Sequence, residues 1–214
     1  MTWEVITGDC LEVMPTLDRG AISAVITDPP YGMGKLNRFG NRSRLTKATP
    51  YTPIIGDDKP FNPAPFLDFP IVVMFGANWY ADKLPPSGGW IVWDKKDGLP
   101  PNDFSDGEMA WVKGSNTVRI IHHRWSGMLK ASEQQERRCH PTQKPVAVMA
   151  WIIEKYTQPG DLIFDPFCGS GTTGVAAAQT GRRFIGVEIL EDYATIARER
   201  IAKAAAQAQQ LELL

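Results

Sequence analysis

An apolar, β-rich run from Ala21 to Ile26 leads directly into the turn segment Thr27–Gly32, which reads Thr-Asp-Pro-Pro-Tyr-Gly. Proline fixes φ, removes a hydrogen-bond donor and pushes the preceding residue into an extended conformation, so this sequence predicts a strand that ends in a rigid turn. Asp28 and the carbonyl group of Pro29 are therefore expected at the carboxyl end of a strand. Open α/β sheets bind their ligands at that edge.

The turn offers a carboxylate (Asp28), a carbonyl oxygen (Pro29) and an aromatic ring (Tyr31). These groups can accept both N–H bonds of a planar exocyclic amino group while the ring stacks on the heterocycle. The alternative is an ordinary turn in which Asp28 accepts a backbone N–H. With Pro30 included, the tetrad resembles motif IV of the amino-methyltransferases, which methylate an exocyclic nitrogen of a nucleobase. The resemblance implies a catalytic role for all four residues.

The whole chain has the size and composition of one domain. Its 214 residues, 43% of them apolar, suffice for a single sheet and its helices. A net charge of -1 means that any contact with DNA must come from locally concentrated basic residues. Three cysteines at 10, 139 and 168 lack paired or metal-type spacing, no apolar run is long enough to span a membrane, and the N-terminus lacks the basic start of a signal peptide. We expect residues 1–214 to form one soluble catalytic domain in a reducing cytoplasm.

Short β-type runs alternate with helical stretches, which favours an α/β fold. Strands are expected at 3–7, 21–26, 71–75, 90–93, 109–112, 118–122, 161–165 and 184–187. Helices are expected at 11–17, 146–156, 174–179 and from 193 to about 207, where a Gln-rich end is expected to fray. A proline-rich segment, 59–65, leads into the strand at 71–75. Asp94 and Lys95 follow another strand, where a surface turn is favoured over a place in a base pocket.

The apolar run ending at Asp165 passes into a Gly-rich turn. Glycines at 169 and 171 let the backbone approach a ligand closely and adopt φ values closed to other residues. With Gly174 they match a dinucleotide-binding spacing, which keeps a nicotinamide oxidoreductase open as an alternative. The string from 165 to 173 instead resembles motif I of the S-adenosylmethionine-binding fold. The resemblance implies that the cofactor contacts Asp165, Phe167, Cys168, Gly169, Gly171, Thr172 and Thr173.

Two acidic residues follow expected strands at positions that suit a bound nucleoside. Glu188 can accept hydrogen bonds from both hydroxyls of a ribose. Asp9 lies between a strand and a helix, where it can also act as an N-cap. In the family that the chain resembles, the Gly8–Asp9 pair lies beside the adenine of the cofactor, and the expected cofactor contacts extend to Cys10 and Asp28.

The segment His140–Pro145 precedes an amphipathic helix and reads His-Pro-Thr-Gln-Lys-Pro. It resembles motif X of the β-group of DNA amino-methyltransferases, where this motif packs on the methionine end of the cofactor. The resemblance implies cofactor contacts for His140, Thr142 and Lys144.

Two segments concentrate positive charge and are predicted to be mobile loops that contact DNA. Residues 33–56 contain five basic residues and no acidic residue, and 123–140 mix basic and aromatic residues. Such loops can bind phosphates and unstacked bases, although a solvated surface loop is the alternative. The expected DNA contacts are Lys35, Arg38, Arg42, Arg44, Lys47, Arg124, Lys130, Arg137 and Arg138.

The order of these motifs resembles the circularly permuted β-group of DNA amino-methyltransferases. In that reading, the Gly8–Asp9 segment is the part of the unpermuted fold that follows Glu188. The resemblance implies a Rossmann-like methyltransferase fold with a mostly parallel sheet and helices on both faces. The chain differs from this group in size. Only residues 32–139 remain for target recognition, and they must also supply several strands.

The resemblance implies transfer of a methyl group from S-adenosyl-L-methionine to N6 of adenine in double-stranded DNA, after base flipping. Asp rather than Ser at position 28 favours adenine over cytosine N4. Cytosine N4, RNA adenine, a protein amide and a non-catalytic DNA-binding role stay open as alternatives. No metal and no membrane partner are expected. A monomer or a homodimer is expected, and a cognate restriction endonuclease stays open as a partner.

Overall fold

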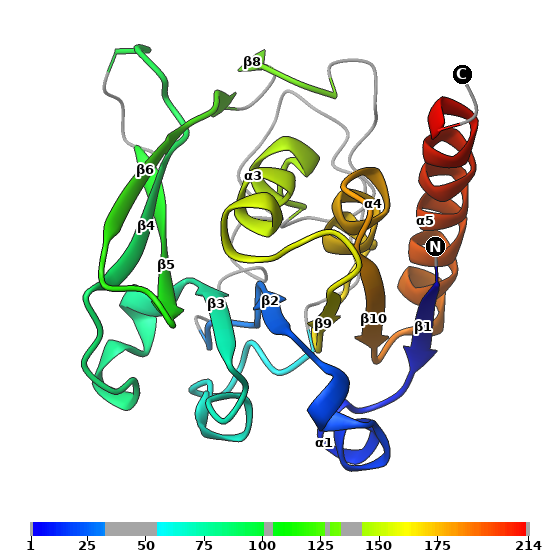
Figure 1. Ribbon diagram of the computed structural model, residues 1–214. Helices are drawn as coiled ribbons and strands as arrows, with labels where there is room; N and C mark the ends of the chain where they lie inside the picture. Colours follow the sequence, from blue (N-terminus) through cyan, green and yellow to red (C-terminus); the bar gives the residue numbers. More distant parts are fainter. Residues whose placement is uncertain (1, 33–54, 101–104, 127–128, 134–142, 213–214) are drawn as a thin grey trace, which may run out of the picture.

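The computed structural model describes residues 2–32, 55–100, 105–126, 129–133 and 143–212. Its centre is an eight-stranded sheet in the order β1-β10-β9-β2-β3-β5-β4-β6 (Figure 1). The strands are β1 (Trp3–Thr7), β2 (Ala24–Thr27), β3 (Ile71–Phe75), β4 (Gly89–Asp94), β5 (Gly107–Lys113), β6 (Val118–His122), β9 (Leu162–Asp165) and β10 (Arg183–Glu188). Strand β5 is antiparallel to both of its neighbours, and the other neighbouring pairs are parallel.

The two faces of the sheet are covered differently. The long helices α3 (Val146–Tyr156), α4 (Thr172–Gln179) and α5 (Glu191–Glu212) share one hydrophobic core with one face. The second core, on the other face, contains residues of α1 (Cys10–Val13) and of short 3-10 turns. Because both faces are buried, the central strands β2 and β9 are buried at every position. The expected α/β fold with a mostly parallel sheet is confirmed, with the long helices on one face only.

The 3-10 turns lie mainly at the ends of strands. They are η1 (Met14–Thr16), η2 (Arg19–Ala21), η3 (Ala64–Phe66), η4 (Ala77–Trp79) and η5 (Ala81–Lys83). A small hairpin, β7 (Trp125–Ser126) with β8 (Leu129–Lys130), forms a separate two-stranded sheet that the sequence did not predict.

The first strand of the chain lies beside the last one. Strand β1 pairs with β10 in parallel register, with Trp3 opposite Phe184, and α5 packs along β1 (Figure 1). Residues that follow β1 therefore reach the same edge of the sheet as those that follow β10, β9, β2 and β3. The residues at the start of β5 reach this edge as well, because β5 runs in the opposite direction.

Most of the expected elements agree with the structure, but the strand expected from Ala21 begins at Ala24, with Ala21 in η2, and two helix ends differ. The helix expected at 11–17 is one α-helical turn, α1, followed by η1, since Pro15 lacks the N–H that would continue the helix. The last helix continues to Glu212 instead of fraying near 207. Its final turns contain Ala, Gln, Leu and Glu, which are good helix formers, and neither Gly nor Pro. In the part of the chain that the structure describes, no helix is both long and apolar enough to cross a membrane.

Gly174 lies where α4 packs against α5 and the sheet. A substitution at this position therefore tests how closely these elements pack. A Cβ atom there would lie 2.7 Å from Phe184 Cε1 and 2.8 Å from Ile201 Cγ1. Gly174→Ala should therefore lower the free energy of unfolding by about 1–3 kcal/mol, the usual cost of overpacking a core. The measurement is the urea midpoint of unfolding. Gly20→Ala is the control, because its added Cβ would approach one side-chain atom, Asp18 Oδ1, at 3.3 Å; equal midpoints for the two variants would contradict this account.

Candidate active site

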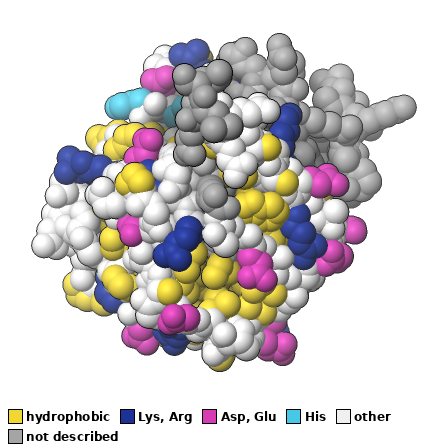
Figure 2. Space-filling view, turned by 45° about the vertical axis from the view of Figure 1, so that its right-hand side comes forward, with side chains coloured by type: hydrophobic (Ala, Val, Ile, Leu, Met, Phe, Trp, Pro, Cys, Tyr) yellow, Lys and Arg dark blue, Asp and Glu magenta, His cyan; other side chains and the backbone are white. Residues whose placement is uncertain are grey.

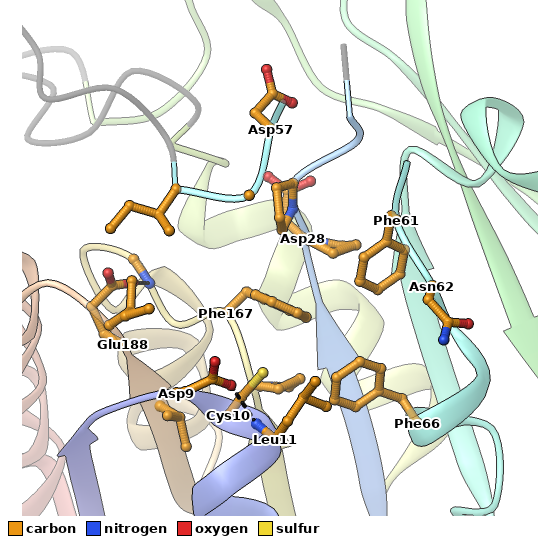
Figure 3. Close-up of a pocket in the computed structure, with 18 of the residues that line it drawn as sticks. Asp9, Cys10, Leu11, Asp28, Asp57, Phe61, Asn62, Phe66, Phe167 and Glu188 are labelled. Carbon is orange, nitrogen blue, oxygen red and sulfur yellow. Dashed lines mark hydrogen bonds between the residues drawn. The ribbon is translucent and has the colours of Figure 1, made fainter. Parts of the chain in front are cut away.

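A cavity of about 530 Å³ opens at the edge of the sheet where the parallel strands end. This volume lies within the range of small-molecule binding sites. The walls come from the residues after β1, β2, β9 and β10 and from the segment 55–66 (Figure 3). Segments that are far apart in the sequence thus meet at one site because their strands are parallel neighbours.

Aromatic rings line one wall of the cavity. The ring centroid of Phe167 lies 5.6 Å from that of Phe61 and 5.5 Å from that of Phe66, both in edge-to-face geometry. Tyr80 supports Phe61 at 4.9 Å. In Figure 3, Glu188 and Asp9 lie to the left of Phe167, whereas Phe61 and Phe66 lie to its right. The cavity therefore combines a carboxylate side with an aromatic side.

The mouth of the cavity carries apolar side chains that face solvent. Leu11, Ile55 and Ile189 line the cavity and remain 51%, 49% and 45% exposed. Figure 2 shows hydrophobic side chains gathered on one face of the molecule, with acidic and basic side chains around them. Exposed apolar groups that converge on a cavity suit a flat, partly apolar ligand.

Asp28 stands at the end of the buried strand β2, as the sequence predicts, and lines the cavity. Its Oδ1 accepts a hydrogen bond from the hydroxyl group of Tyr31, and its Oδ2 lies 2.5 Å from the Nζ of Lys144. The ring of Tyr31 packs directly on Gly76, which has a φ of 68° and where a Cβ would overlap the ring. Burial raises the pKa of Asp28, whereas the Lys144 ammonium group acts in the opposite direction.

Lys144 is buried between two carboxylates. Its Nζ lies 3.1 Å from Glu108 Oε2, and Lys95 Nζ lies 2.9 Å from Glu108 Oε1. Burial alone would lower the pKa of Lys144, but the charges of Asp28 and Glu108 outweigh burial and raise it. Burial acts to raise the pKa of Glu108, but Lys144 and Lys95 together bring it down to about 2. Lys144 is thus a charged group that contacts the candidate catalytic carboxylate.

Glu188 joins the Gly-rich turn to the end of β10. Its Oε2 accepts from the N–H of Gly169 at 2.8 Å, and its Oε1 accepts from the N–H of Leu190 at 2.9 Å. A carboxylate can accept more hydrogen bonds than these two, and the side chain lines the cavity. Burial raises the pKa of Glu188. Gly171 has a φ of 83° and leaves no room for a Cβ against Ala197, so it allows α5 to pack closely here, and its cofactor contact stays a prediction.

Asp9 caps a helix and also lines the cavity, as each of the two interpretations of the sequence requires. Its Oδ1 accepts from the N–H of Leu11 at 2.8 Å, which makes it the N-cap of α1. It also lines the cavity, as does the neighbouring Cys10. Burial, with the charge of Asp9, raises the pKa of the Cys10 thiol to about 12, so this thiol is uncharged at neutral pH.

Asp165 is an anchor inside the fold rather than a wall of the main cavity. It accepts hydrogen bonds from Thr27 Oγ1 (2.7 Å), Thr173 Oγ1 (2.6 Å) and the N–H of Phe167 (3.1 Å). Burial raises its pKa to about 6, against the effect of these donors. It lines a small cavity of about 50 Å³ that lies behind Asp28.

The expected cofactor residues fall into four groups, one of which is Gly171 alone, which is not among the residues that line either cavity. Those that line the main cavity are Asp9, Cys10, Asp28, Phe167, Gly169 and Glu188. Those that line only the small cavity are Lys144, Asp165, Cys168, Thr172 and Thr173. His140 and Thr142 lie outside the described residues. The cofactor roles of all these residues remain predictions.

Several residues that line the main cavity were not predicted from the sequence. Asp57, Phe61, Asn62 and Phe66 lie in or beside the proline-rich segment, which has no strand or helix period. Asp57 accepts from the N–H of Gly32 at 3.1 Å and so ties this segment to the Asp28 turn. The one local signal was the pair of aromatic residues among the prolines.

Only part of the expected DNA surface lies in the described residues. Arg124 and Lys130 meet at the β7–β8 hairpin, where the N–H of Ala131 donates to the carbonyl of Arg124. An Arg124 Nη donates to the carbonyl of Asp97 at 3.0 Å, and Lys130 Nζ lies 4.8 Å from the ring of Trp125. Lys35, Arg38, Arg42, Arg44, Lys47, Arg137 and Arg138 lie outside the described residues. Their contacts with DNA remain predictions.

Asp94 belongs to a surface turn, as favoured by the sequence. Its Oδ1 accepts from the N–H groups of Lys96 and Asp97, and its Oδ2 lies 3.0 Å from His122 Nδ1. Among the residues that the structure describes, no group of three or more His, Cys, Asp or Glu side chains is arranged to hold a metal ion.

Residues 92–199, about half of the chain, match the family model of the N6 and N4 methyltransferases, which is described as DNA methylase. The chain therefore belongs to this DNA methylase family. Among its relatives is the putative methylase YubD of Escherichia coli strain K12, which is 29% identical over 92% of this chain and 89% of YubD. The type II methyltransferase M2.DpnII of Streptococcus pneumoniae is 38% identical, but the match covers 52% of this chain and 41% of that enzyme.

Solved structures support the same assignment. The M1.HpyAVI–SAM complex has 26% sequence identity and a TM-score of 0.59, with 94% of this chain and 99% of that chain covered. The cytosine-N4-specific PvuII DNA methyltransferase has a TM-score of 0.62 over 97% of this chain and 93% of that chain. At 16% identity, the second likeness concerns the fold alone.

The raised pKa of Asp165 predicts how stability depends on pH. Because the folded state binds this proton more tightly than the unfolded chain, Asp165 stabilises the fold most at low pH and loses that contribution as the pH rises through about 6. The free energy of unfolding of the wild type, minus that of Asp165→Asn, should fall by on the order of 3 kcal/mol between about pH 4 and 7. Urea unfolding at several pH values measures this difference. A difference that stays flat or increases with pH would show that the carboxyl group is not held as described.

Proposed function

We propose that this protein transfers a methyl group from S-adenosylmethionine to the N6 amino group of adenine in DNA. The observation that carries the proposal is the position of Asp28, a partly buried carboxylate at a strand end, on the wall of the cavity that also contains Glu188 and Asp9. A carboxylate and a fixed carbonyl beside a nucleoside-sized cavity suit the capture of an amino group. Membership of the DNA methylase family supports the same chemistry.

The residues of the cavity fit S-adenosylmethionine, which is the cofactor. Glu188 lines the cavity and is an acceptor suited to ribose hydroxyls, and the apolar mouth suits an adenine ring. Aromatic faces such as that of Phe167 attract a cationic sulfonium group. The described carboxylates of the cavity wall, Asp9, Asp28, Asp57 and Glu188, favour a ligand that carries positive charge. A solved relative, M1.HpyAVI, is known as a SAM complex.

When bound, the cofactor supplies an electrophilic methyl group. The protein's part is to orient the amino group, whose lone pair is otherwise delocalised into the ring. Hydrogen bonds from the two N–H groups to Asp28 and to the Pro29 carbonyl would localise the lone pair. The rest of the rate enhancement would come from holding the amino nitrogen in line with the methyl group. No covalent nucleophile is required, and the buried Cys10 and Cys168 have raised pKa values because of burial. The proton leaves after the nitrogen has become cationic.

Access to the amino group requires that the base leave the duplex. Tyr31 is the residue proposed to stack on the flipped base. In this structure its hydroxyl group donates to Asp28 and its ring packs on Gly76, so stacking requires Tyr31 to leave both contacts. The base itself would then replace the hydroxyl group as a donor to Asp28.

Adenine is preferred over cytosine because position 28 is Asp. Cytosine N4 is the second candidate, since its amino group presents the same two N–H donors. The likeness to the PvuII enzyme extends only to the fold. The permuted order of motifs is part of the proposal, and the pairing of β1 with β10 supports it, because it puts the N-terminal strand next in space after Glu188. Double-stranded DNA is the proposed partner, held by the basic loops.

Replacement of the carboxylate tests the reaction directly. Asp28→Ala should reduce methyl transfer to unmethylated DNA by several orders of magnitude, because the amino group loses an acceptor that fixes it. Digestion to nucleosides and mass spectrometry identify the product, which should be N6-methyladenosine in its deoxy form. Asp68→Ala, at a position whose side chain is 85% exposed, should retain wild-type activity. N4-methylcytosine from the wild type would transfer the proposal to cytosine, and no methylated nucleoside at all would refute it.

Replacement of Glu188 tests the cofactor site without any turnover. Glu188→Gln should weaken binding of S-adenosylhomocysteine by about tenfold or more, because charged hydrogen bonds to the ribose are lost. Isothermal calorimetry measures the affinity. Glu191→Gln, an exposed neighbour that binds Thr7 and Arg198 instead, is the matched control. NAD bound more tightly than S-adenosylhomocysteine would support the oxidoreductase alternative.

A further inference from the structure

Four side chains of alternating charge lie in a row behind the main cavity, in the order Asp28, Lys144, Glu108 and Lys95. The nitrogen-to-oxygen distances between neighbours are 2.5, 3.1 and 2.9 Å. The exposed fractions of the side chains are 17% for Asp28, 8% for Lys144, 27% for Glu108 and 21% for Lys95. The two acids and two bases balance, so the row is neutral as a whole although none of its members is well hydrated.

The antiparallel strand explains how this row reaches the site. Glu108 is the second residue of β5, which runs against its neighbours, so its amino end lies at the edge where the parallel strands end. Lys95 follows the end of β4 at the same edge, where Trp93 pairs with Glu108. Lys144 arrives from the segment before α3. The first helical N–H, that of Val146, donates to Glu133 Oε2 at 3.0 Å, which helps to fix this segment.

Lys144 approaches Asp28 from the side that faces away from the main cavity. Asp28 lines both the large and the small cavity, whereas Lys144 lines only the small one. The ammonium group therefore leaves the cavity face of the carboxylate to a ligand. Tyr31, which lines the large cavity, holds the other carboxylate oxygen and is the contact that a ligand must displace.

We propose that Lys144 and Glu108 are positioning residues for methyl transfer, with Lys144 holding Asp28 as an oriented carboxylate and Glu108 holding Lys144. This inference rests on the proposed function. In this proposal Lys144 helps to hold the target amino group by orienting Asp28. This role differs from the cofactor contact that the sequence led us to expect for Lys144.

Electrostatics explains why such support is needed. An acceptor for two N–H groups works best as a carboxylate, yet burial favours the protonated acid. The charge of Lys144 and its hydrogen bond oppose burial, as does the hydroxyl group of Tyr31, while Glu108 acts against them. Among the described residues, two further titratable groups interact with Asp28, namely Tyr80 and Asp165, whose pKa values are raised by burial and by the charge of Asp28.

A competing account is that Lys144 is a plug that occupies the place of the target amino group. A plug must leave before the substrate binds, so its removal should accelerate the reaction. A positioning residue must stay, so its removal should slow the reaction and shift its pH profile. Lys144→Met separates the two accounts.

The experiment follows two readouts in the full-length protein. One is the ¹³C chemical shift of the Asp28 carboxyl group against pH, assigned by its loss in Asp28→Asn. The other is the rate of methyl transfer against pH. Lys144→Met should move both titrations to higher pH. At a pH below the new pKa, the rate should fall roughly tenfold for each pH unit by which the titration has moved. Lys144→Arg should restore both curves toward the wild type.

Glu108→Gln should shift the Asp28 titration in the direction opposite to the shift in Lys144→Met. The Glu108 charge acts to raise the pKa of Asp28, so without it the Asp28 titration should move to lower pH. A purely structural role would lower the rates of both variants and would not shift their titrations in opposite directions. Lys155→Met, which removes an exposed lysine from α3, should leave both curves unchanged.

Urea midpoints show whether each variant is folded, and Lys144→Arg and Glu108→Gln keep the volume of the cluster if Lys144→Met unfolds. Faster methylation by Lys144→Met would establish the plug, and unshifted titrations in folded variants would overturn the inference. Both outcomes leave the proposed function intact, provided that the wild type methylates DNA. Failure of the wild type to methylate DNA would overturn the proposed function and this inference with it.

Discussion

One buried carboxylate, that of Asp165, holds together the two turns from which the site is built. It accepts from the hydroxyl group of Thr27, the residue before Asp28, from the N–H of Phe167 at the start of the Gly-rich turn, and from Thr173 in α4. Burial of this group is costly, as its raised pKa shows, and the three donors offset part of that cost. The Asp28 turn and the Gly-rich turn are therefore fixed relative to each other before any ligand binds.

The charges of the site are arranged in two layers around this anchor. Carboxylates of Asp9, Asp57 and Glu188 line the cavity itself, where a cationic cofactor would meet them. The cation that contacts Asp28 stands behind the wall, at Lys144. This separation allows the cavity to attract positive charge while Lys144, outside the main cavity, acts to lower the pKa of Asp28 and so favours its charged form. The antiparallel β5 makes the second layer feasible, because it brings Glu108 to the same edge of the sheet.

Local signals in the sequence predicted the strands and the Asp28 and Glu188 positions, because a strand that ends in a turn is encoded by neighbouring residues. The order of motifs led to a fold that the structure confirms. The aromatic wall was not predictable, since Phe61 and Phe66 lie in a segment without periodicity and meet Phe167 only in the folded chain. The ion pair of Lys144 with Asp28 joins residues 116 positions apart, and nothing near either residue indicates the other. Cofactor contact was therefore the natural but unsupported expectation for Lys144.

The position of Asp28 also limits what this residue can decide about the substrate. Adenine and cytosine present the same pair of N–H donors from an exocyclic amino group, so a carboxylate and a carbonyl bind both in the same way. Asp at position 28 therefore favours adenine through the family resemblance rather than through these two hydrogen bonds, and physical discrimination would come from the contacts offered to the rest of the ring, because one base is bicyclic and the other is not. In the described part of the chain, the Tyr31 ring packs on Gly76 and its hydroxyl group donates to Asp28. On the proposed mechanism, base preference would therefore depend on the contacts that form when Tyr31 moves, whereas Asp28 and Pro29, the proposed acceptors for the amino group, already line the cavity.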